Sequence, residues 1–585
     1  MGGFYLCRLT EEHADEARIT AAEAQFRLHG FSRFTPLHTA AHAGFHAAPI
    51  HGSTHDSHAC FHRDGDDFIA VAGTLIHGGR FGEAALRALL ADFRFPFEDW
   101  SNTTGQFAAL VHKAGRTYAF TDFFGAFQLF HDADWDVVST SFLAAAKSLD
   151  RVTFDPQGVY EFAFNVFPTG DDTVLGELKR LGPDAQMELG ATTARAPVSK
   201  PLPERVSATP IGTRIAAQAE RLRGAARIYA EAFGDRMQCP LSGGLDSRLA
   251  LALLRDAGVS PHVYVYGSPG DGDVEVARHI AEREGFRFEP FEKASFARIT
   301  PDDFPAIVAR NFHETDALVT DGGLFDNGGN AHARHKRQEG GQLAVSGGCG
   351  EVFRNFFYLP DRALTARQVM GAFFARYTLS DVTGVFDPRG FLDRLEAKAL
   401  AALEKPGHTG KLRRTLIEQL YPRMRCRAFF GREISLVGRQ GAYFMPFFDH
   451  EVVAGALQLP IALKNAGRFE AALLTHIDPV LAAYPSDYGY SFDRPPTLSH
   501  RMNELGTRVR PPWLRQRSYA VRRRLGSVPD EHGGLLTPAF LGRVLDLHFP
   551  HMQQFFRMKA ITDSGLYRRI ATLEYLAQHL ERQIG

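Results

Sequence analysis

A glycine-rich turn between a short apolar segment and a strongly apolar helix constrains this chain more than any other stretch. Residues 237–240 supply the apolar lead-in, and residues 241–247 read Leu-Ser-Gly-Gly-Leu-Asp-Ser. Residues 248–254 then have the composition of a buried helix, which we expect to end at Gly258. A strand, a tight turn and a helix in this order point several backbone N–H groups and the positive end of a helix dipole at one position. The stretch therefore predicts an anion-binding site.

The side chains of this turn indicate which anion is bound. Two serines and two glycines let the donors come close to the anion, and Asp246 can hold a magnesium ion against it. No lysine stands where a Walker A loop needs one, and no GxxxxGK[ST] string occurs in the chain. We therefore interpret the anion as the pyrophosphate end of ATP. The candidate nucleotide contacts are Leu241, Ser242, Gly243, Gly244, Asp246 and Ser247, and Asp246 is also the candidate metal ligand and a candidate catalytic residue.

A second glycine-rich loop lies further along the chain. Residues 343–353 read Leu-Ala-Val-Ser-Gly-Gly-Cys-Gly-Glu-Val-Phe, an apolar strand that runs into a glycine-rich loop and then into the start of a helix. Successive backbone N–H groups in such a loop form a second anion-binding nest. Arg354 follows directly and is a candidate cation for the phosphates, with an ordinary surface salt bridge as the alternative.

These two motifs resemble those of a known family. The string SGGLDS is similar to the signature of the PP-loop ATP pyrophosphatases. Within that group the whole chain resembles the asparagine synthetase family, which includes β-lactam synthetase and the lasso-peptide cyclases. The resemblance implies that ATP and Mg²⁺ are bound and that ATP is cleaved to AMP and pyrophosphate while a substrate is adenylated.

The resemblance also assigns residues outside the first turn. Gly348 and Glu351 match the family's second signature, which makes Gly348 a nucleotide contact and Glu351 a candidate catalytic residue. By the same resemblance, Tyr266 and Gly267 border the adenine. Gly347 and Gly350 stand where the asparagine synthetases carry a glutamate and a magnesium-linked aspartate. We find no equivalent of the family's transition-state lysine, and the substitutes considered are Lys464, Arg468 and Arg494.

Residues 1–195 have short strand-like segments separated by turns, with helical stretches between them, which is typical of an α+β domain. This region resembles the N-terminal-nucleophile (Ntn) glutaminase domain of the asparagine synthetases. The chain, however, opens Met1-Gly2-Gly3 where that family has a cysteine after the methionine, and the family's glutamine clamp is replaced by residues 72–74, Ala-Gly-Thr. Cys7 cannot act through its own α-amino group. We therefore expect a glutaminase-like domain that produces no ammonia.

Residues 196–208 are rich in proline and are predicted to be an extended linker. Residues 209–585 are predicted to form the synthetase domain. An amphipathic helix at 211–233 precedes alternating strands and helices that predict a doubly wound α/β parallel sheet. The chain from 363 onwards is predicted to be mostly helical.

Three further segments have two interpretations each. The polar residues at 314–323 suit a substrate-contacting loop with Asp321 as a candidate base, or a solvated turn. Seven histidines at 38–62 are solvated loop residues or metal ligands, since His38, His42 and His46 are four residues apart and would share one face of a helix. The arginines at 508–524 form a solvated face or a docking surface for an acidic or extended partner.

Composition narrows the class of protein. The formal net charge of −1 over 585 residues suggests neither a nucleic-acid partner nor an anionic membrane. Five cysteines without CxxC pairs suit reduced thiols, the longest apolar run is too short to span a bilayer, and no signal peptide is recognised. We expect a cytoplasmic protein.

The predicted function is an AMP-forming ligase that adenylates a carboxylate and forms an amide bond without glutamine. The expected substrate is a small-molecule or peptide carboxylate, with a peptide macrolactam favoured and a peptide-processing protein as partner. The alternatives are an asparagine synthetase that uses free ammonia and a degenerate family member that binds nucleotide without chemistry. A tRNA-modifying PP-loop enzyme is disfavoured by the neutral charge.

Overall fold

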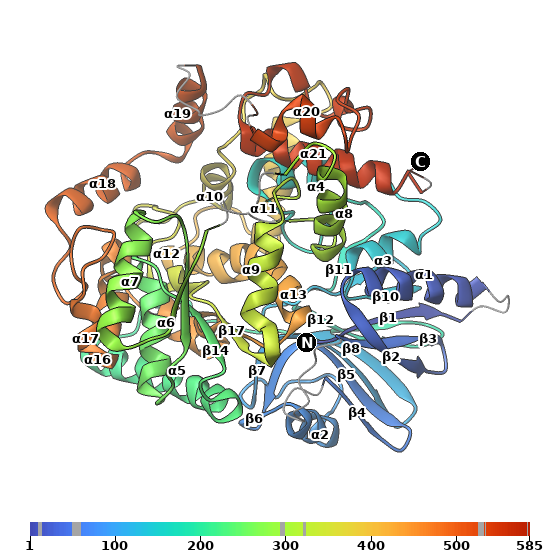
Figure 1. The fold of residues 1–585 in the computed structure, drawn as a ribbon, viewed down its shortest axis with the longest axis horizontal. Coiled ribbons are helices and arrows are strands. Elements are labelled where there is room, and N and C mark those ends of the chain that lie inside the picture. The colour runs from blue at the N-terminus through green and yellow to red at the C-terminus, as the bar shows by residue number, and fades with distance from the viewer. Residues whose placement is uncertain are drawn as a thin grey trace.

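The computed structural model describes residues 1–9, 14–49, 60–292, 299–319, 323–524, 532, 534–581 and 583–584. Three sheets organise these residues, two of them antiparallel and built from the first 197 residues, and the third parallel (Figure 1). Helices fill most of the remaining chain.

The first antiparallel sheet has the strand order β11-β9-β10-β1-β3-β2. Its strands are β1 (Gly3–Arg8), β2 (Phe31–His38), β3 (His42–Pro49), β9 (Phe130–His131), β10 (Val137–Ser139) and β11 (Lys179–Arg180). The second sheet has the order β13-β12-β8-β7-β5-β4, with β6 paired to β5. Its strands are β4 (Phe61–Asp64), β5 (Asp67–His77), β6 (Arg80–Phe81), β7 (Thr103–Lys113), β8 (Arg116–Thr121), β12 (Ala185–Leu189) and β13 (Ala194–Pro197).

These two sheets form the middle layers of a four-layer unit. The helices α1 (Ala14–Leu28) and α3 (Phe142–Lys147) lie against the first sheet, and α2 (Glu83–Asp92) lies against the second. Along β5, Phe68, Ala70 and Ile76 face the main core, whereas Ile69 and Val71 pack under α2. This alternation follows from the period of two along a strand. The α+β arrangement predicted for this region is present in the structure.

The parallel sheet has the order β16-β15-β14-β17-β18. Its strands are β14 (Met237–Pro240), β15 (His262–Tyr266), β16 (Phe288–Phe291), β17 (Leu343–Val345) and β18 (Tyr443–Phe444). The accompanying helices are α5 (Ile211–Phe233), α6 (Leu245–Asp256), α7 (Gly272–Glu284) and α9 (Gly329–Gln338). On α5 the apolar positions predicted from their spacing are buried, including Leu222, Ala226 and Tyr229. The predicted parallel sheet and the predicted amphipathic helix before it are both present.

The rest of the described chain is mostly helical, as predicted for residues beyond 363. Before that point lie α4 (Pro156–Asn165) and α8 (Phe304–Glu314). Beyond it lie α10 (Ala366–Phe373), α11 (Pro388–Ala402), α12 (Arg414–Glu418), a π-helical segment (Tyr421–Phe430), α13 (Gly431–Gln440), α14 (His450–Leu457), α15 (Ile461–Lys464), α16 (Arg468–Ile477), α17 (Pro479–Ala483), α18 (Leu498–Arg508), α19 (Pro512–Arg524), α20 (Pro538–Leu541) and α21 (Ser564–His579). Within the described ranges, no helix has both the length and the apolar character needed to cross a bilayer.

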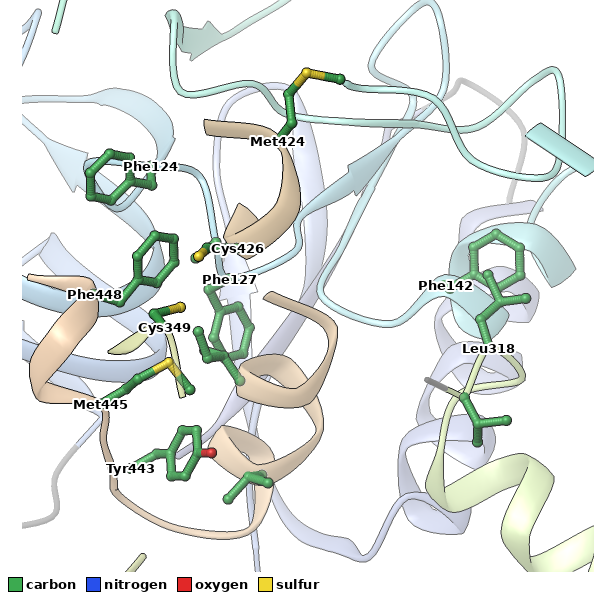
Figure 2. Packing of buried hydrophobic residues seen from close by; sticks show 14 of the residues in the cluster. Phe124, Phe127, Phe142, Leu318, Cys349, Met424, Cys426, Tyr443, Met445 and Phe448 are labelled. Atoms are coloured by element: carbon green, nitrogen blue, oxygen red, sulfur yellow. The ribbon is translucent and has the colours of Figure 1, made fainter. Parts of the chain in front are cut away.

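The hydrophobic core is continuous between the antiparallel sheets and the later helices (Figure 2). Phe124 stacks on Phe448 with ring centroids 4.8 Å apart and an interplanar angle of 7°.

The predicted linker starts inside β13, which ends at Pro197. Further along the linker, the ammonium of Lys200 lies 3.9 Å from the ring centroid of Trp100. The division of the chain at 196–208 stays a prediction.

Two histidines of the histidine-rich segment fit neither of its sequence interpretations. His42 and His46 lie on β3 and are buried, so they are neither solvated loop residues nor members of a helical face. His42 Nε2 lies 3.0 Å from Trp135 O, and the His46 ring stacks on Phe61. Within the described ranges no group of three or more histidine, cysteine, aspartate or glutamate side chains is arranged to hold a metal. Residues 50–59, with three of the seven histidines, lie outside those ranges.

Candidate nucleotide-binding site

The first glycine turn connects β14 to α6, as the sequence predicts. β14 ends at Pro240 and α6 begins at Leu245. Leu241 is buried and donates its backbone N–H to Tyr264 O on β15 (2.8 Å), which ties the turn to the sheet. The N-terminal end of α6, with the positive end of its dipole, therefore lies at the carboxyl edge of the parallel sheet.

Side chains of the protein occupy the backbone donors of this turn. Ser242 N donates to Ser247 Oγ (3.0 Å), and Gly244 N donates to Ser242 Oγ (3.1 Å). Gly243 N donates to the carboxylate of Asp273 on α7 (2.6 Å). A carboxylate at Gly243 N is the kind of anion that such a turn binds. A phosphate at this position would have to displace Asp273.

The second glycine loop lies directly against the first. A Cβ atom added at Gly347 would lie 2.9 Å from Ser247 N, and one added at Gly350 would lie 2.0 Å from Asp246 Oδ1. The two loops can touch because neither position carries a side chain. Gly348 is also confined, since a Cβ there would lie 2.8 Å from the ring of Phe430. The aspartate that the family resemblance implies at 350 has no room beside Asp246.

The strand order explains why two loops so far apart in the sequence meet. From β14 the sheet grows through β15 and β16 on one side, and through β17 and β18 on the other. The loops after β14 and β17 therefore leave the sheet in different directions at its carboxyl edge. Such a switch point is where doubly wound sheets bind their ligands.

An ion-pair cluster lies where the two loops touch. Arg354 donates to Asp246 Oδ2, and its Nε lies 3.3 Å from Oε2 of Glu470 on α16. Arg354 is therefore not the surface salt bridge of the alternative interpretation, because Glu470 is completely buried. Burial alone would lower the pKa of Arg354, but Asp246 and Glu470 outweigh it and raise that pKa. The guanidinium stays charged beside them.

The cluster has two carboxyl groups, those of Asp246 and Glu470, for one guanidinium. Burial, followed by the neighbouring Asp246 carboxylate, raises the pKa of Glu470 well above its usual value. In the described part of the chain, Oδ1 of Asp246 and both carboxylate oxygens of Glu470 are buried without a hydrogen-bond partner. Buried carboxylate oxygens without a hydrogen bond are costly, so the site favours an additional cation or proton.

These oxygens fit the magnesium ion that the family resemblance implies. Mg²⁺ prefers hard oxygen ligands and is commonly held by one or two carboxylates together with substrate phosphates. Asp246 and Glu470 supply that donor set. Arg354 is already paired with Asp246, so its guanidinium would have to share that carboxylate with the ion.

Glu470 was missed by the sequence analysis, although a signal for it exists. On α16 it shares a helical face with Leu473, Leu474 and Ile477, at steps of three, four and seven residues, and all four side chains are buried. An acidic residue on the apolar face of a helix is rarely buried without a charged partner. That pattern predicts a functional or ion-paired carboxylate.

Glu351 borders a cavity beside the two loops. The cavity has a volume of about 540 Å³, and Leu245, Glu351 and Arg354 contribute to its wall. Tyr421 donates its hydroxyl to Glu351 Oε2 (2.5 Å), which fixes the carboxylate at the cavity wall. The structure thus brings together Asp246, Glu351, Gly348 and Arg354, as the sequence analysis expects.

The two residues expected beside an adenine end a neighbouring strand. Tyr266 is the last residue of β15, and its ring lies 5.7 Å from that of Phe291. Gly267 is the next residue, and its backbone N–H donates to Phe291 O (3.3 Å). Because β15 pairs with β14, both residues lie at the same carboxyl edge as the first turn. Their contact with an adenine stays a prediction.

The candidate base Asp321 lies outside the described residues. Of the segment at 314–323, residues 314–319 and 323 are described, and residues 315–319 are buried and so do not form a solvated turn. Glu314 ends α8, and Asp316 is completely buried, accepting hydrogen bonds from Ser141 and from the start of α3. Asp316 therefore joins the two halves of the chain.

The proposed substitutes for the family's lysine do not reach the loops as free cations. Lys464 is buried and donates to Glu418 Oε2 (2.9 Å) and to Val352 O (2.9 Å). Arg468 lines a separate cavity, which shares Ala466 and Glu504 with the cavity beside the loops. For Arg494 the structure shows only a backbone hydrogen bond, from its N–H to Ser491 O.

The start of the chain lies beside the residues aligned with the glutamine clamp. The amine of Met1 donates to Gly73 O (2.9 Å), and burial lowers its pKa to about 5. Cys7 is buried in β1 with its sulfur 3.7 Å from Ala43 O. No catalytic role for this region follows from these contacts.

Comparison with known proteins leaves the family resemblance as an inference from sequence. No family model matches the chain, and no curated protein matches it. Among solved structures it is similar to glutamine phosphoribosylpyrophosphate amidotransferase from B. subtilis complexed with ADP and GMP, with 13% identity over 51% of this chain and 68% of that chain and a TM-score of 0.22. A structure described as the allosteric regulatory enzyme of purine biosynthesis matches with 12% identity over the same shares and a TM-score of 0.23. TM-scores this low carry no argument about fold or function.

Proposed function

We propose that this protein is an ATP-dependent ligase that converts ATP to AMP and pyrophosphate, activates a carboxylate as its acyl-adenylate, and forms an amide bond. One observation carries the proposal. Two glycine loops touch at the switch point of a parallel sheet, with Asp246 and Arg354 at their contact. Anion-binding turns converging on one point suit a triphosphate better than a single small anion.

In this reaction an oxygen of the substrate carboxylate attacks the α-phosphorus. The bond between the α-phosphorus and the oxygen that bridges it to the β-phosphate breaks. Pyrophosphate leaves against the backbone donors of the two loops and the guanidinium of Arg354. An amine then attacks the acyl carbon, AMP leaves with the adenylate oxygen, and the amine loses a proton. The protein contributes positioning and charge stabilisation, because all bonds are made between substrates.

Asp246 and Glu470 would hold Mg²⁺ in this scheme. When bound, the ion would neutralise phosphate charge and orient the triphosphate. Before substrate binds, Arg354 balances part of the charge of the same two carboxylates. Asp273 accepts a hydrogen bond from Gly243 N and would move aside for a phosphate oxygen.

The source of the amine follows from the first 195 residues. In the proposed scheme these residues supply no ammonia, because residues 72–74, Ala-Gly-Thr, replace the family's glutamine clamp. We propose that the amine belongs to the substrate, as in a peptide that is closed into a macrolactam, and that a peptide-processing protein supplies it.

A second candidate is a protein that binds nucleotide without turning it over. The ion pair between Arg354 and Asp246 favours it, because a guanidinium already contacts the predicted metal ligand. Gly347 and Gly350, where the family has acidic residues, favour it too.

The two candidates are separated by following the phosphates. The whole chain is incubated with Mg²⁺ and ATP labelled at the α-phosphate, with a panel of amino acids and short linear peptides. The ligase releases labelled AMP, whereas the second candidate binds α,β-methylene-ATP in calorimetry and releases none. ADP as the product, or no binding of the analogue, contradicts the proposal.

Asp246→Asn is the decisive variant. It removes the charge at the loop contact while keeping the shape, and we expect AMP formation to fall by about 10²- to 10³-fold, as for a lost electrostatic contact in a transition state. Asp235→Asn is the matched control, because Asp235 only accepts a hydrogen bond from Ser260 N at the surface. Undiminished turnover in Asp246→Asn would rule out the assigned site.

A further inference from the structure

A second cavity adjoins the one beside the glycine loops. It has a volume of about 530 Å³ and lies between α10, α19 and the π-helical segment. Phe356, Tyr358 and Thr507 line both cavities, so the two share a wall. In Figure 1, α18 and α19 run along the edge of the molecule, and α19 packs against α10.

The lining of this cavity is strongly basic. Five arginines contribute to it: Arg376, Arg425, Arg510, Arg515 and Arg522. No aspartate or glutamate of the described residues lines it. The chain as a whole has a formal net charge of −1, so this concentration of one sign is local.

Three of the lining arginines, Arg376, Arg510 and Arg515, have no carboxylate partner among the described residues. Arg515 donates to the carbonyl oxygens of Phe357 (2.8 Å) and Tyr358 (2.6 Å), and Arg510 donates to Gly506 O (3.2 Å) and to Thr507 Oγ1 (3.3 Å). These acceptors are neutral. Neither arginine, nor Arg376, forms a salt bridge with a carboxylate of the described chain. Burial and the nearby Arg510 lower the pKa of Arg515.

Aromatic rings complete the cavity. Phe356, Phe357, Phe373 and Phe429 contribute to the wall, and the guanidinium of Arg425 lies 3.4 Å from the ring centroid of Phe429. Stacking on a ring holds an arginine in one orientation. The arrangement suits a ligand with an apolar body and several acidic groups, because guanidinium groups bind carboxylates and phosphates in a bidentate manner.

We propose that this cavity binds a group with at least two negative charges, carboxylate or phosphate, on the molecule that is activated in the adjoining cavity. The link to an activated substrate rests on the proposed function, whereas the anion site itself does not. The basic segment at 508–524 is then not wholly a solvated face. Arg510, Arg515 and Arg522 line the cavity, and Arg523 pairs with Asp381.

The test is equilibrium binding of small anions to the whole chain, by calorimetry without nucleotide. Citrate and inorganic pyrophosphate are the probes, and acetate at equal ionic strength is the singly charged control. We expect citrate or pyrophosphate to bind and acetate not to bind, with binding weakened by added sodium chloride. If neither polyanion binds better than acetate, the proposal is wrong.

Variants locate the binding. Arg376→Gln and Arg510→Gln are each expected to raise the dissociation constant about tenfold, since each removes charge-assisted hydrogen bonds. Arg510→Lys, which keeps the charge but loses the planar fork, should fall between wild type and Arg510→Gln and guards against a folding defect. Arg517→Gln is the matched control, because Arg517 lies on α19 over Trp513 and does not line the cavity.

The outcomes separate this site from the proposed reaction. If Arg517→Gln weakens binding as much as the cavity variants do, the weaker binding comes from the loss of positive charge in general, and the proposal is overturned. If pyrophosphate binding changes with Asp246→Asn but not with Arg376→Gln, pyrophosphate binds at the glycine loops and the cavity does not take phosphates. Citrate binding that responds to the arginine variants supports the cavity site even if no AMP is ever formed, in which case only the proposed reaction fails.

Discussion

At the scale of single residues, the glycines of the second loop matter for the space that they leave empty. Gly350 allows the carboxylate of Asp246 to lie against the backbone of that loop, at a place where a Cβ would be 2.0 Å from Oδ1. The φ angle of Gly350 is not in the left-handed region, so close approach and not backbone conformation explains the glycine. The contact between the two loops depends on this position.

Gly350→Ala should push the loops apart. We expect a loss of about 1–3 kcal/mol in unfolding free energy, the usual cost of an added methyl group in a packed site. AMP formation, if the proposed function holds, should fall together with it. The matched control is Gly371→Ala on α10, where nothing lies within 4 Å of the added Cβ. That control should be neutral or stabilising by up to about 1 kcal/mol. Equal effects of the two substitutions in denaturant unfolding would contradict the crowding argument.

At the scale of elements, a buried arginine joins α6 to the segment that covers the first turn. Arg248 is completely buried, and its Nη atoms donate to Tyr484 O (2.8 Å) and Pro485 O (2.8 Å). Burial lowers its pKa to about 10, so it stays charged at neutral pH, and its guanidinium lies 4.8 Å from the ring centroid of Phe492. This bridge holds Asp487 over Gly243.

Arg248→Met should release that segment. Two charged hydrogen bonds are lost, so we expect the free energy of unfolding to fall by about 2–4 kcal/mol. Amide hydrogen exchange at 484–491 should become faster than elsewhere. Asp256→Asn on the same helix is the control, because Asp256 is exposed and pairs with Arg223 on α5, an interaction worth about 0–1 kcal/mol. Unchanged exchange at 484–491 in Arg248→Met would show that other contacts position the segment.

At the scale of the whole molecule, one buried carboxylate joins the first sheet to the later helices. Asp316 pairs with Arg439 on α13 (2.6 Å) and accepts hydrogen bonds from Ser141 Oγ (2.9 Å) and Leu143 N (2.8 Å). Burial alone would raise the pKa of Asp316, but Arg439 and the other charged neighbours outweigh it and hold the pKa well below the usual range. His29 beside it has its pKa lowered to about 3, chiefly by burial.

Both shifts make the fold sensitive to acid. The folded pKa of Asp316 is depressed, so its contribution is complete above the unfolded value of about 3.9 and is lost as pH falls below it. The depressed pKa of His29 acts in the same direction, and its contribution is lost as pH falls from about 6.5 towards 3. Urea-unfolding midpoints should therefore fall steadily between pH 7 and pH 4. His29→Gln should flatten that slope, and an unchanged slope would contradict the assignment.

Asp316→Asn should destabilise the protein by about 3–5 kcal/mol at pH 7, because it leaves Arg439 buried without its partner. The difference from wild type should shrink as the pH is lowered towards 3, since the aspartate of the unfolded wild-type chain then takes up a proton and asparagine does not. Asp184→Asn is the control, since Asp184 and Arg195 form an exposed ion pair, with an expected effect of about 0–1 kcal/mol. The free energies of unfolding of wild type, Asp316→Asn and Asp184→Asn are measured by denaturant unfolding at several pH values.

Local sequence determined the elements and the two glycine turns. The helix spacing at 211–233, the strand before Leu241 and the start of α6 follow from apolar periodicity and turn residues, which act over a few neighbours. Those signals could not show that β3 carries His42 and His46 into the core, because four-residue spacing also suits a helix. They also could not place Asp316, whose partners Ser141 and Arg439 are distant in sequence.

The tertiary structure alone decided which charges share the site. Strand order brings the loops after β14 and β17 together, and packing then adds Glu470 from α16 and Asp273 from α7. The arginine-lined cavity also exists only after α19 has packed beside α10. Hydrophobic patterns are local and can be read along the chain, whereas the balance of buried charge depends on which distant segments meet.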